Sequence, residues 1–292
     1  MDQLLISKFQ EAAADMAKLV TVNDNHQYSR VSDGKWLAGV STVSNVMPKE
    51  WLSAWGGKEA VKDLGYTDYL DVEEEMERAS KIHEEIKAMD TKQYIKRLGK
   101  AKGASGRKSK QALTDGTAGH AWLEDFVKAR IQGTDLPIIT EGMLERPLKQ
   151  FVKWEAKYVD YWVLSEALVT DAETYAGRFD GLAMMKNGKL AIIDFKFASH
   201  ISFDYYLQTA GYQHPFTKYG LKIDDRIIIR LPKTLEREEY DKVTHKYSKV
   251  PNDIEVKRVD TNYEFDRDTF LAALPVKKWI NYMEHTYKKT TN

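Results

Sequence analysis

The residues best placed to do chemistry lie in an apolar segment, 189–197, which contains Asp194 and Lys196. Residues two apart on a strand share a face, so we expect these two side chains to lie next to each other. The remaining residues of the segment are apolar on both faces, as in a central strand that is covered on both sides. A carboxylate and an ammonium there are costly unless they pair, bind a metal ion or meet a charged ligand.

The length of the turn before this segment decides whether Asp180 joins the pair. A loop of two residues would place Asp180 opposite Phe195, on the other face of the hairpin. A loop of three residues that ends at Gly188 places Asp180 opposite Asp194 instead. Its last position is left-handed, and glycine adopts that conformation freely. We therefore predict the three-residue loop.

Asp180 and Asp194 would then be two carboxylates placed next to each other. Like charges at that distance repel unless a cation lies between them. Carboxylate oxygens prefer hard cations, so the pattern predicts Mg²⁺ or Mn²⁺, as one or two ions. For Asp194 and Lys196 taken alone, a buried ion pair with a purely structural role stays the alternative.

Further polar residues are expected near these carboxylates. His120 and Glu124 share a helix face, and the histidine would add a nitrogen ligand that favours Mn²⁺, or else would be a core histidine. Glu166, on the strand before the hairpin, would be a ligand, a supporting partner of a ligand, or part of a salt bridge on the strand face.

A helix that follows the 189–197 strand carries Gln208 and Tyr212, four residues apart, with Tyr205 one turn earlier. Because this helix starts close to the end of the strand, its first turns are expected near the site. The two side chains would orient a phosphate, the lysine or a base. Ordinary helix packing with polar tips is the alternative.

A second candidate binding feature is a basic run, 92–110, which contains no acidic residue. Its three glycines predict a flexible second half, and such a run can follow a phosphate backbone. A solvated loop is the alternative. The candidate DNA-binding residues are Lys96, Arg97, Lys100, Lys102, Arg107, Lys108 and Lys110.

Composition excludes several classes of site. The 292 residues contain 44 basic and 44 acidic side chains, so net charge alone indicates no nucleic-acid partner. There is no cysteine, which excludes disulfides, thiolate zinc sites, iron–sulfur clusters and thiol nucleophiles. No stretch reaches the roughly 18 apolar residues of a membrane span. We expect a soluble protein of the bacterial, or phage-infected, cytoplasm without a membrane partner.

The order of elements predicts an α/β (α+β) fold with a central mixed sheet flanked by helices and an N-terminal helical lobe. The lobe is expected over 1–115, with a small hairpin and the basic loop, and the core over 116–292. Helices are expected at 3–20, 48–62, 71–89, 114–130, 141–157, 203–219 and 266–287. A hairpin is expected at 28–37, and strands at 161–170, 175–185, 189–197, 226–231 and 255–259.

Four motifs in this order resemble the PD-(D/E)XK nuclease superfamily, RecB-like branch, over about 117–231. The N-terminal segment 28–43 is also similar to phage-type and mitochondrial genome maintenance exonucleases of this branch. The motifs are His120-x-x-x-Glu124, Gly177-x-x-Asp180, Asp194-x-Lys196 and Gln208-x-x-x-Tyr212.

The resemblance implies a restriction-endonuclease-like core and a role for each site residue. Lys196 would position or activate the attacking water, Glu166 would be an auxiliary acid, and Gln208 and Tyr212 would complete the site. The metal ligands would be Asp180, Asp194, His120 and the backbone carbonyl of Phe195. The absence of cysteine departs from family members that carry an iron–sulfur cluster.

We therefore expect a metal-dependent DNA exonuclease that hydrolyses phosphodiester bonds at DNA ends or in single strands. Recombination, repair and phage DNA metabolism are the expected roles, with DNA as partner and a recombination protein as a second one. The alternatives are a structure- or sequence-specific endonuclease and a non-catalytic module that binds DNA ends. Products from circular and linear substrates would separate them.

Overall fold

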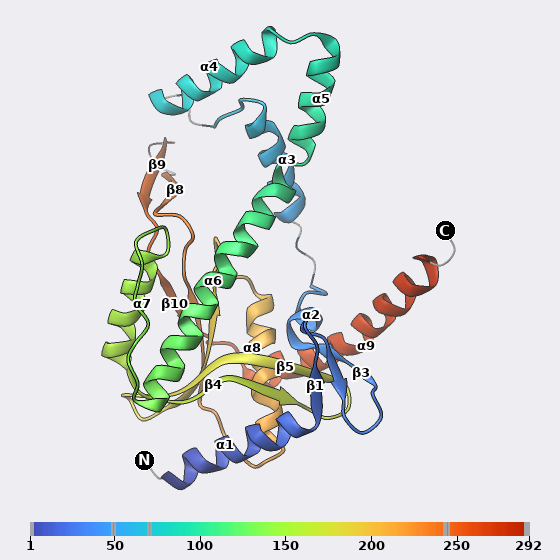
Figure 1. Cartoon of the computed structure of the whole chain (residues 1–292), viewed down its shortest axis with the longest axis vertical. Coiled ribbons are helices and arrows are strands. Elements are labelled where there is room, and N and C mark those ends of the chain that lie inside the picture. Colours follow the sequence, from blue (N-terminus) through green and yellow to red (C-terminus); the bar gives the residue numbers. More distant parts are fainter. Residues whose placement is uncertain are drawn as a thin grey trace. The chain divides into compact units, whose positions relative to one another are not determined.

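The computed structural model of the protein describes residues 3–47, 49, 51–68, 70, 72–241, 244 and 246–288 (Figure 1). The side chains of residues 51, 52, 111–115, 238, 240, 246, 247, 287 and 288 are outside this description. Its helices are α1 Gln3–Lys18, α2 Val40–Ser44, α3 Trp51–Asp63, α4 Glu73–Lys87, α5 Thr91–Lys102, α6 Ala104–Gln132, α7 Glu145–Tyr158, α8 Asp204–Thr217 and α9 Tyr263–Lys288. Its strands are β1 Val20–Val22, β2 Tyr28–Arg30, β3 Trp36–Gly39, β4 Val159–Thr170, β5 Tyr175–Met185, β6 Leu190–Lys196, β7 Asp225–Arg230, β8 Glu236–Asp241, β9 Lys246–Pro251 and β10 Glu255–Arg258.

The expected fold class is confirmed, because a central mixed sheet is flanked by helices. The sheet has the order β1-β2-β3-β5-β6-β7-β10, and β4 also pairs with β5. The β3–β5 and β6–β7 pairs are parallel, whereas the other pairs are antiparallel. Apart from these, β8 and β9 form a two-stranded antiparallel sheet.

The ladders of β5 leave a gap in this sheet. Along one edge, β4 pairs with β5 from Ala176 to Met185, with register shifts between Val159 and Tyr161 and between Trp162 and Leu164. The other edge is therefore shared by β3, which pairs at 175–176, and β6, which pairs at 181–184. Residues 177–180 of β5 lie between these two ladders, and Asp180 is the last of them.

Both faces of the sheet are covered, as the apolar 189–197 segment predicts. Ile192 packs in a cluster with residues of α1, α2, α8 and α9, such as Phe216. Its neighbour Ile193 packs in a second cluster with residues of α6 and α7, such as Phe126 and Phe151. Adjacent residues of β6 therefore face two different helical layers.

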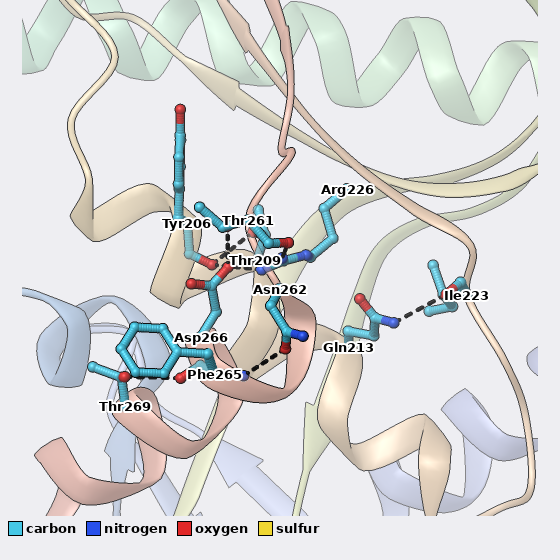
Figure 2. A network of polar contacts seen from close by, with 10 residues as sticks. All are labelled: Tyr206, Thr209, Gln213, Ile223, Arg226, Thr261, Asn262, Phe265, Asp266 and Thr269. Carbon is cyan, nitrogen blue, oxygen red and sulfur yellow. Dashed lines mark hydrogen bonds and ion pairs between the residues drawn. The ribbon is translucent and has the colours of Figure 1, made fainter.

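A buried polar network fastens α9 to β7 and α8 (Figure 2). Arg226 of β7 pairs with Asp266 of α9 at 2.7 Å, and both side chains are buried. Its other nitrogen donates to the backbone oxygen of Tyr206 in α8 at 3.1 Å. The start of α9 is capped where the Asn262 side chain accepts the N–H of Phe265 at 3.0 Å. Removing one partner of such a buried ion pair costs about 3–5 kcal/mol, so this contact fixes the α9 end of the core.

The chain divides into two compact units by its internal contacts. One contains Met1–Met47, Ala118–Leu235 and Asn252–Asn292, and the other contains Pro48–Thr117 and Glu236–Pro251. This division differs from the expected boundary at residue 115. Residues 3–47 belong with the core because α1 packs on β4 and because β3 pairs with β5.

The basic run 92–110 is not the expected loop, which corrects that prediction. It is helical in α5 and α6, and only Gly103 separates the two. Asp90 and Gln93 form a capping box at the start of α5, and Lys, Arg, Ala and Gln are good helix formers. These local signals outweigh the cost of the glycines.

Other expected elements agree with the structure to within a few residues, apart from α6, which begins at Ala104. The expected helix starts Pro48 and Asp71 lie outside the described residues. The short elements β1, α2, β8 and β9 were not predicted. None of the helices in the described ranges is long and apolar enough to cross a membrane.

Candidate active site

The hairpin of β5 and β6 has the three-residue loop that the sequence predicts. Met185 N donates to Lys189 O at 2.9 Å, and Gly188 N donates to Met185 O at 2.9 Å. Gly188 has φ +79°, the left-handed conformation expected at the end of this loop. The last ladder pair is Gly181 with Ile193, so Asp180 and Asp194 are the next opposed positions.

At Asp180 a side chain replaces the missing ladder partner. Its Oδ2 accepts the backbone N–H of Phe195 at 2.5 Å, just beyond the end of the β5–β6 ladder. Burial raises the pKa of Asp180, although the Lys196 ammonium and the Phe195 N–H act to lower it. The Asp180 carboxylate is therefore held in place but is left with unfavourable solvation.

Asp194 and Lys196 form a buried ion pair on β6, with Nζ 2.6 Å from Oδ2. Burial raises the pKa of Asp194 to about 6, and the Asp180 charge adds to this while Lys196 opposes it. Burial would lower the pKa of Lys196, but the Asp194 and Asp180 charges outweigh it and raise that pKa. Lys196 therefore stays a cation between two carboxylates.

His120 reaches the site from α6, with Nδ1 3.8 Å from Asp180 Oδ1. Its ring packs against Phe197 at 5.2 Å. This close approach depends on Gly119, because a Cβ there would lie 2.1 Å from the Phe197 ring. Burial, followed by the Lys196 charge, lowers the pKa of His120 to about 4. The imidazole is therefore neutral at neutral pH, which is the form that can ligate a metal.

Glu166 lies on β4 across from Asp180, between the pairs Ser165–Gly181 and Ala167–Phe179. Its φ is +48°, which is unusual for a residue with a Cβ and points to strain held by the surrounding sheet. Burial raises the pKa of Glu166 to about 8, and the Asp180 and Glu124 charges add to this. Glu166 is therefore protonated at neutral pH in the absence of a cation.

Helix α8 places Gln208 and Tyr212 together on one side of the sheet. Gln208 Nε2 donates to the Tyr212 hydroxyl at 2.8 Å, and both side chains are buried. Burial, followed by the Asp194 charge, raises the pKa of Tyr212 well above its usual value, so the phenol keeps its proton. Gly177 permits this packing, because a Cβ there would lie 2.8 Å from the Tyr212 ring.

Tyr205 and Lys233 are two neighbours of the site to which the sequence assigned no role. Lys196 Nζ lies over the Tyr205 ring at 5.1 Å, a cation–π distance. Lys233 is near enough to contribute to the lowered pKa of His120. The sequence could have indicated that Lys233 lies near the site, because the parallel strands β6 and β7 end at the same sheet edge and Lys233 follows β7.

The expected DNA-binding residues lie in the other compact unit, where several have acidic partners. Arg97 contacts Asp63 at 2.8 Å, Arg107 lies 3.6 Å from the same carboxylate, and Lys108 pairs with Glu59. Among the described residues, three other members of the set have no ion-pair partner. These are Lys96, Lys100 and Lys102.

The fit of a metal ion can be judged from the carboxylates themselves. In the part of the chain that the structure describes, no three His, Asp or Glu side chains form a ready-made cage. Mg²⁺, however, is commonly held by one or two carboxylates and completed by water and phosphate oxygens. Asp194 Oδ2 is buried with no aligned hydrogen bond, apart from its ion pair with Lys196. Asp180 and Asp194 thus fit a two-carboxylate site.

No known family description and no curated protein matches the chain. Among solved structures it is similar to an alkaline exonuclease, LHK-Exo, from Laribacter hongkongensis, with 14% identity over 58% of this chain and 85% of that chain and a TM-score of 0.26. It is also similar to SSO0001, with 11% identity over 56% of this chain and 88% of that chain and a TM-score of 0.25. Similarities this low carry no information about function.

Proposed function

We propose that the protein is a metal-dependent nuclease that hydrolyses phosphodiester bonds of DNA. The observation that carries this proposal is the group Asp180, Asp194 and Lys196 at the gap between the ladders of β5. Two buried carboxylates of raised pKa are costly in a purely structural role. A divalent cation between them and an anionic substrate next to Lys196 would offset that cost.

Asp180 and Asp194 would hold the ion, with His120 and the carbonyl of Phe195 as further proposed ligands. When bound, the ion would act as a Lewis acid toward the phosphate and would lower the pKa of an attacking water. Lys196 would stabilise the charge that develops on the phosphate oxygens, and it is positioned for this by Tyr205 and Asp194. Attack at phosphorus would break the bond to the leaving oxygen and give a phosphate end and a hydroxyl end.

Gln208 and Tyr212 would keep the buried side of the site neutral and rigid. Their hydrogen bond and the protonated phenol place no further charge next to Asp194. Glu166, which lies across from Asp180 on β4, would act as the auxiliary acid.

The finer proposal is an exonuclease that acts at DNA ends or on single strands in recombination, repair or phage DNA metabolism. Lys96, Lys100 and Lys102 would contact the phosphate backbone, because among the described residues no acid pairs with them. A recombination protein as second partner and the bacterial or phage-infected cytoplasm as compartment remain proposals that rest on the resemblance.

The test uses end-labelled linear single-stranded DNA, linear duplex and closed circular single-stranded DNA. Each is incubated with Mg²⁺, Mn²⁺ or EDTA, with Asp194→Ala as the inactive control. Metal-dependent loss of linear DNA alone supports the exonuclease, and the labelled end gives its polarity. Cleavage of the circle would indicate an endonuclease. Equal binding by both proteins with no cleavage in either metal would refute the nuclease and leave a DNA-binding module.

A further inference from the structure

Arg178 of β5 differs from the other arginines of the chain in its ion pairing. Among the described residues, every other arginine forms an ion pair with a carboxylate, as Arg267 does with Asp268 at 2.8 Å. Within the same ranges, Arg178 has no hydrogen-bond or ion-pair partner, and its side chain is exposed. Exposed charges are common on protein surfaces. The position of Arg178, rather than its exposure, indicates a binding role.

Arg178 lies two residues before Asp180, in the part of β5 that pairs with neither β3 nor β6. Residues two apart on a strand point to the same face. Phe179, between them, is buried in the cluster formed with α1, α2, α8 and α9. Arg178 and Asp180 therefore both point away from that cluster, to the face from which His120 of α6 approaches Asp180.

The charges around Glu166 place Arg178 on this face independently. Burial, followed by the Asp180 and Glu124 charges, raises the pKa of Glu166. The Arg178 and Lys128 charges oppose this rise. Glu124 and Lys128 belong to α6, so Arg178 lies near Glu166 on the α6 face, on the same side as Asp180. Although Arg178 is close enough to Glu166 for their charges to interact, it forms no ion pair with it, and its donors stay available to a ligand.

Arg178 and Lys196 occupy corresponding places on adjacent strands. Counted from the last pair of the β5–β6 ladder, each is the third residue beyond the end of that ladder. Each also lies two residues from a carboxylate of the proposed metal pair, Asp180 or Asp194. Lys196 is held at 2.6 Å from Asp194 and is largely buried, whereas Arg178 is open to solvent. Lys196 is therefore suited to the scissile phosphate, and Arg178 to a phosphate farther from the metal pair.

We propose that Arg178 binds the phosphate next to the scissile one and thereby fixes the position of the DNA strand on the site. The inference rests on the proposed nuclease function and names a residue that binds its substrate. Two residues of a strand span about 6.7 Å, close to the spacing of neighbouring phosphates along a nucleic-acid strand. A guanidinium can bind two phosphate oxygens at once. Such a contact carries no sequence information.

The first test measures binding of a labelled single-stranded oligothymidylate to the full chain by fluorescence anisotropy, in EDTA and in Ca²⁺, at several salt concentrations. Arg178→Ala is expected to weaken binding about tenfold and to lower the slope of log affinity against log salt by about 0.7. Arg178→Lys keeps the charge and should keep the slope. Arg267→Ala, the matched control, removes the same charge from an ion-paired arginine of α9 and should bind as wild type does. Thermal unfolding checks that each variant is folded.

The second test asks whether the contact is made with the neighbouring phosphate. The cleaved linkage of a short oligothymidylate is first located in Mn²⁺. An uncharged methylphosphonate then replaces the linkage on one side of it or on the other. At one of these two places wild type should lose about tenfold in kcat/KM, and Arg178→Ala should lose nothing further there, because the two changes remove the same contact.

Equal affinity and equal salt slope of wild type and Arg178→Ala would overturn the proposal. So would an equal loss of kcat/KM in Arg178→Ala on the charged substrate and on both methylphosphonate substrates. If wild type binds through Arg178 but cuts nothing in Mg²⁺ or Mn²⁺, the nuclease function fails while the phosphate contact holds. If wild type cuts but Arg178→Ala binds equally well, the phosphate contact alone fails. If wild type neither binds nor cuts, both fail.

Discussion

The carboxylate of Asp180 occupies the place of a strand partner for Phe195, because its Oδ2 accepts the Phe195 N–H at 2.5 Å where the β5–β6 ladder ends. One side chain therefore both joins the two strands and contributes to the proposed metal pair. Phe195 lies between Asp194 and Lys196, so the contact also fixes the backbone that carries them.

The two roles of Asp180 can be separated by substitution. In EDTA at neutral pH, Asp180→Asn should unfold at the same or a higher temperature than wild type. The amide oxygen can still accept the Phe195 N–H, and the buried charge with its raised pKa is removed. Asp180→Ala leaves that N–H without a partner, which costs about 1–3 kcal/mol. Both variants should lose cleavage. Equal destabilisation of the two variants by thermal unfolding would contradict this account.

The raised pKa of Glu166 predicts how stability depends on pH. Burial raises this pKa from 4.5 to about 8, so the folded protein holds the proton more tightly than the unfolded chain. The resulting stabilisation is fully present below pH 4.5 and is lost as the pH rises through about 8. In EDTA, the free energy of unfolding of wild type should therefore fall relative to Glu166→Gln across this window. If the free energies of unfolding of the two proteins, measured with urea, change with pH in parallel, the pKa of Glu166 is not raised in the folded protein.

Two glycines of the helices should respond to alanine in opposite ways. A Cβ at Gly119 would lie 2.1 Å from the Phe197 ring, so Gly119→Ala should destabilise by about 1–3 kcal/mol and displace His120. Gly99 in α5 has nothing within 4 Å of such a Cβ. Gly99→Ala should therefore stabilise by about 1 kcal/mol through helix propensity alone. Thermal unfolding measures whether each variant is less or more stable than wild type. Destabilisation by Gly99→Ala would show that a Cβ at this position of α5 does not lie in open space.

Lys96, Lys100 and Lys102 of α5 should contribute to DNA affinity and to its salt dependence. Changing Lys96, Lys100 and Lys102 together to alanine removes three candidate phosphate contacts. The slope of log affinity against log salt for single strands should decrease by about 2. Arg97→Ala should instead lower stability, since Arg97 bonds Asp63 at 2.8 Å. Anisotropy titrations at several salt concentrations measure the slope, and an unchanged slope would exclude α5 from the DNA contact.

The hairpin that carries the site could be predicted because its signals are local and periodic. Gly188 defines the loop length, the loop length defines the register, and the register places Asp180 opposite Asp194. The apolar runs on either side of this loop likewise predict β5 and β6 to within one residue. These parts depend on neighbours in the chain and needed no knowledge of the tertiary fold.

Features that depend on distant residues could not be predicted in the same way. The left-handed φ of Glu166 arises where β4 passes the end of the β5–β6 ladder. The basic run was expected as a loop because of its glycines, but capping by Asp90 and the propensity of its other residues make it helical. That Asp63 pairs with Arg97 and Arg107 depends on α3 packing near α5 and α6, which no local pattern shows.

The most direct test of the central claim is the rate of hydrolysis of an end-labelled single-stranded oligonucleotide as a function of Mn²⁺ concentration. Wild type is compared with Asp194→Asn, which keeps the shape of the side chain, and with Asp33→Asn, an exposed aspartate of the β2–β3 turn. We predict saturable, Mn²⁺-dependent cleavage by wild type and by Asp33→Asn, and a loss of at least about a hundredfold in Asp194→Asn. Cleavage that persists in Asp194→Asn, or that proceeds equally well in EDTA, would contradict a metal site built on Asp180 and Asp194.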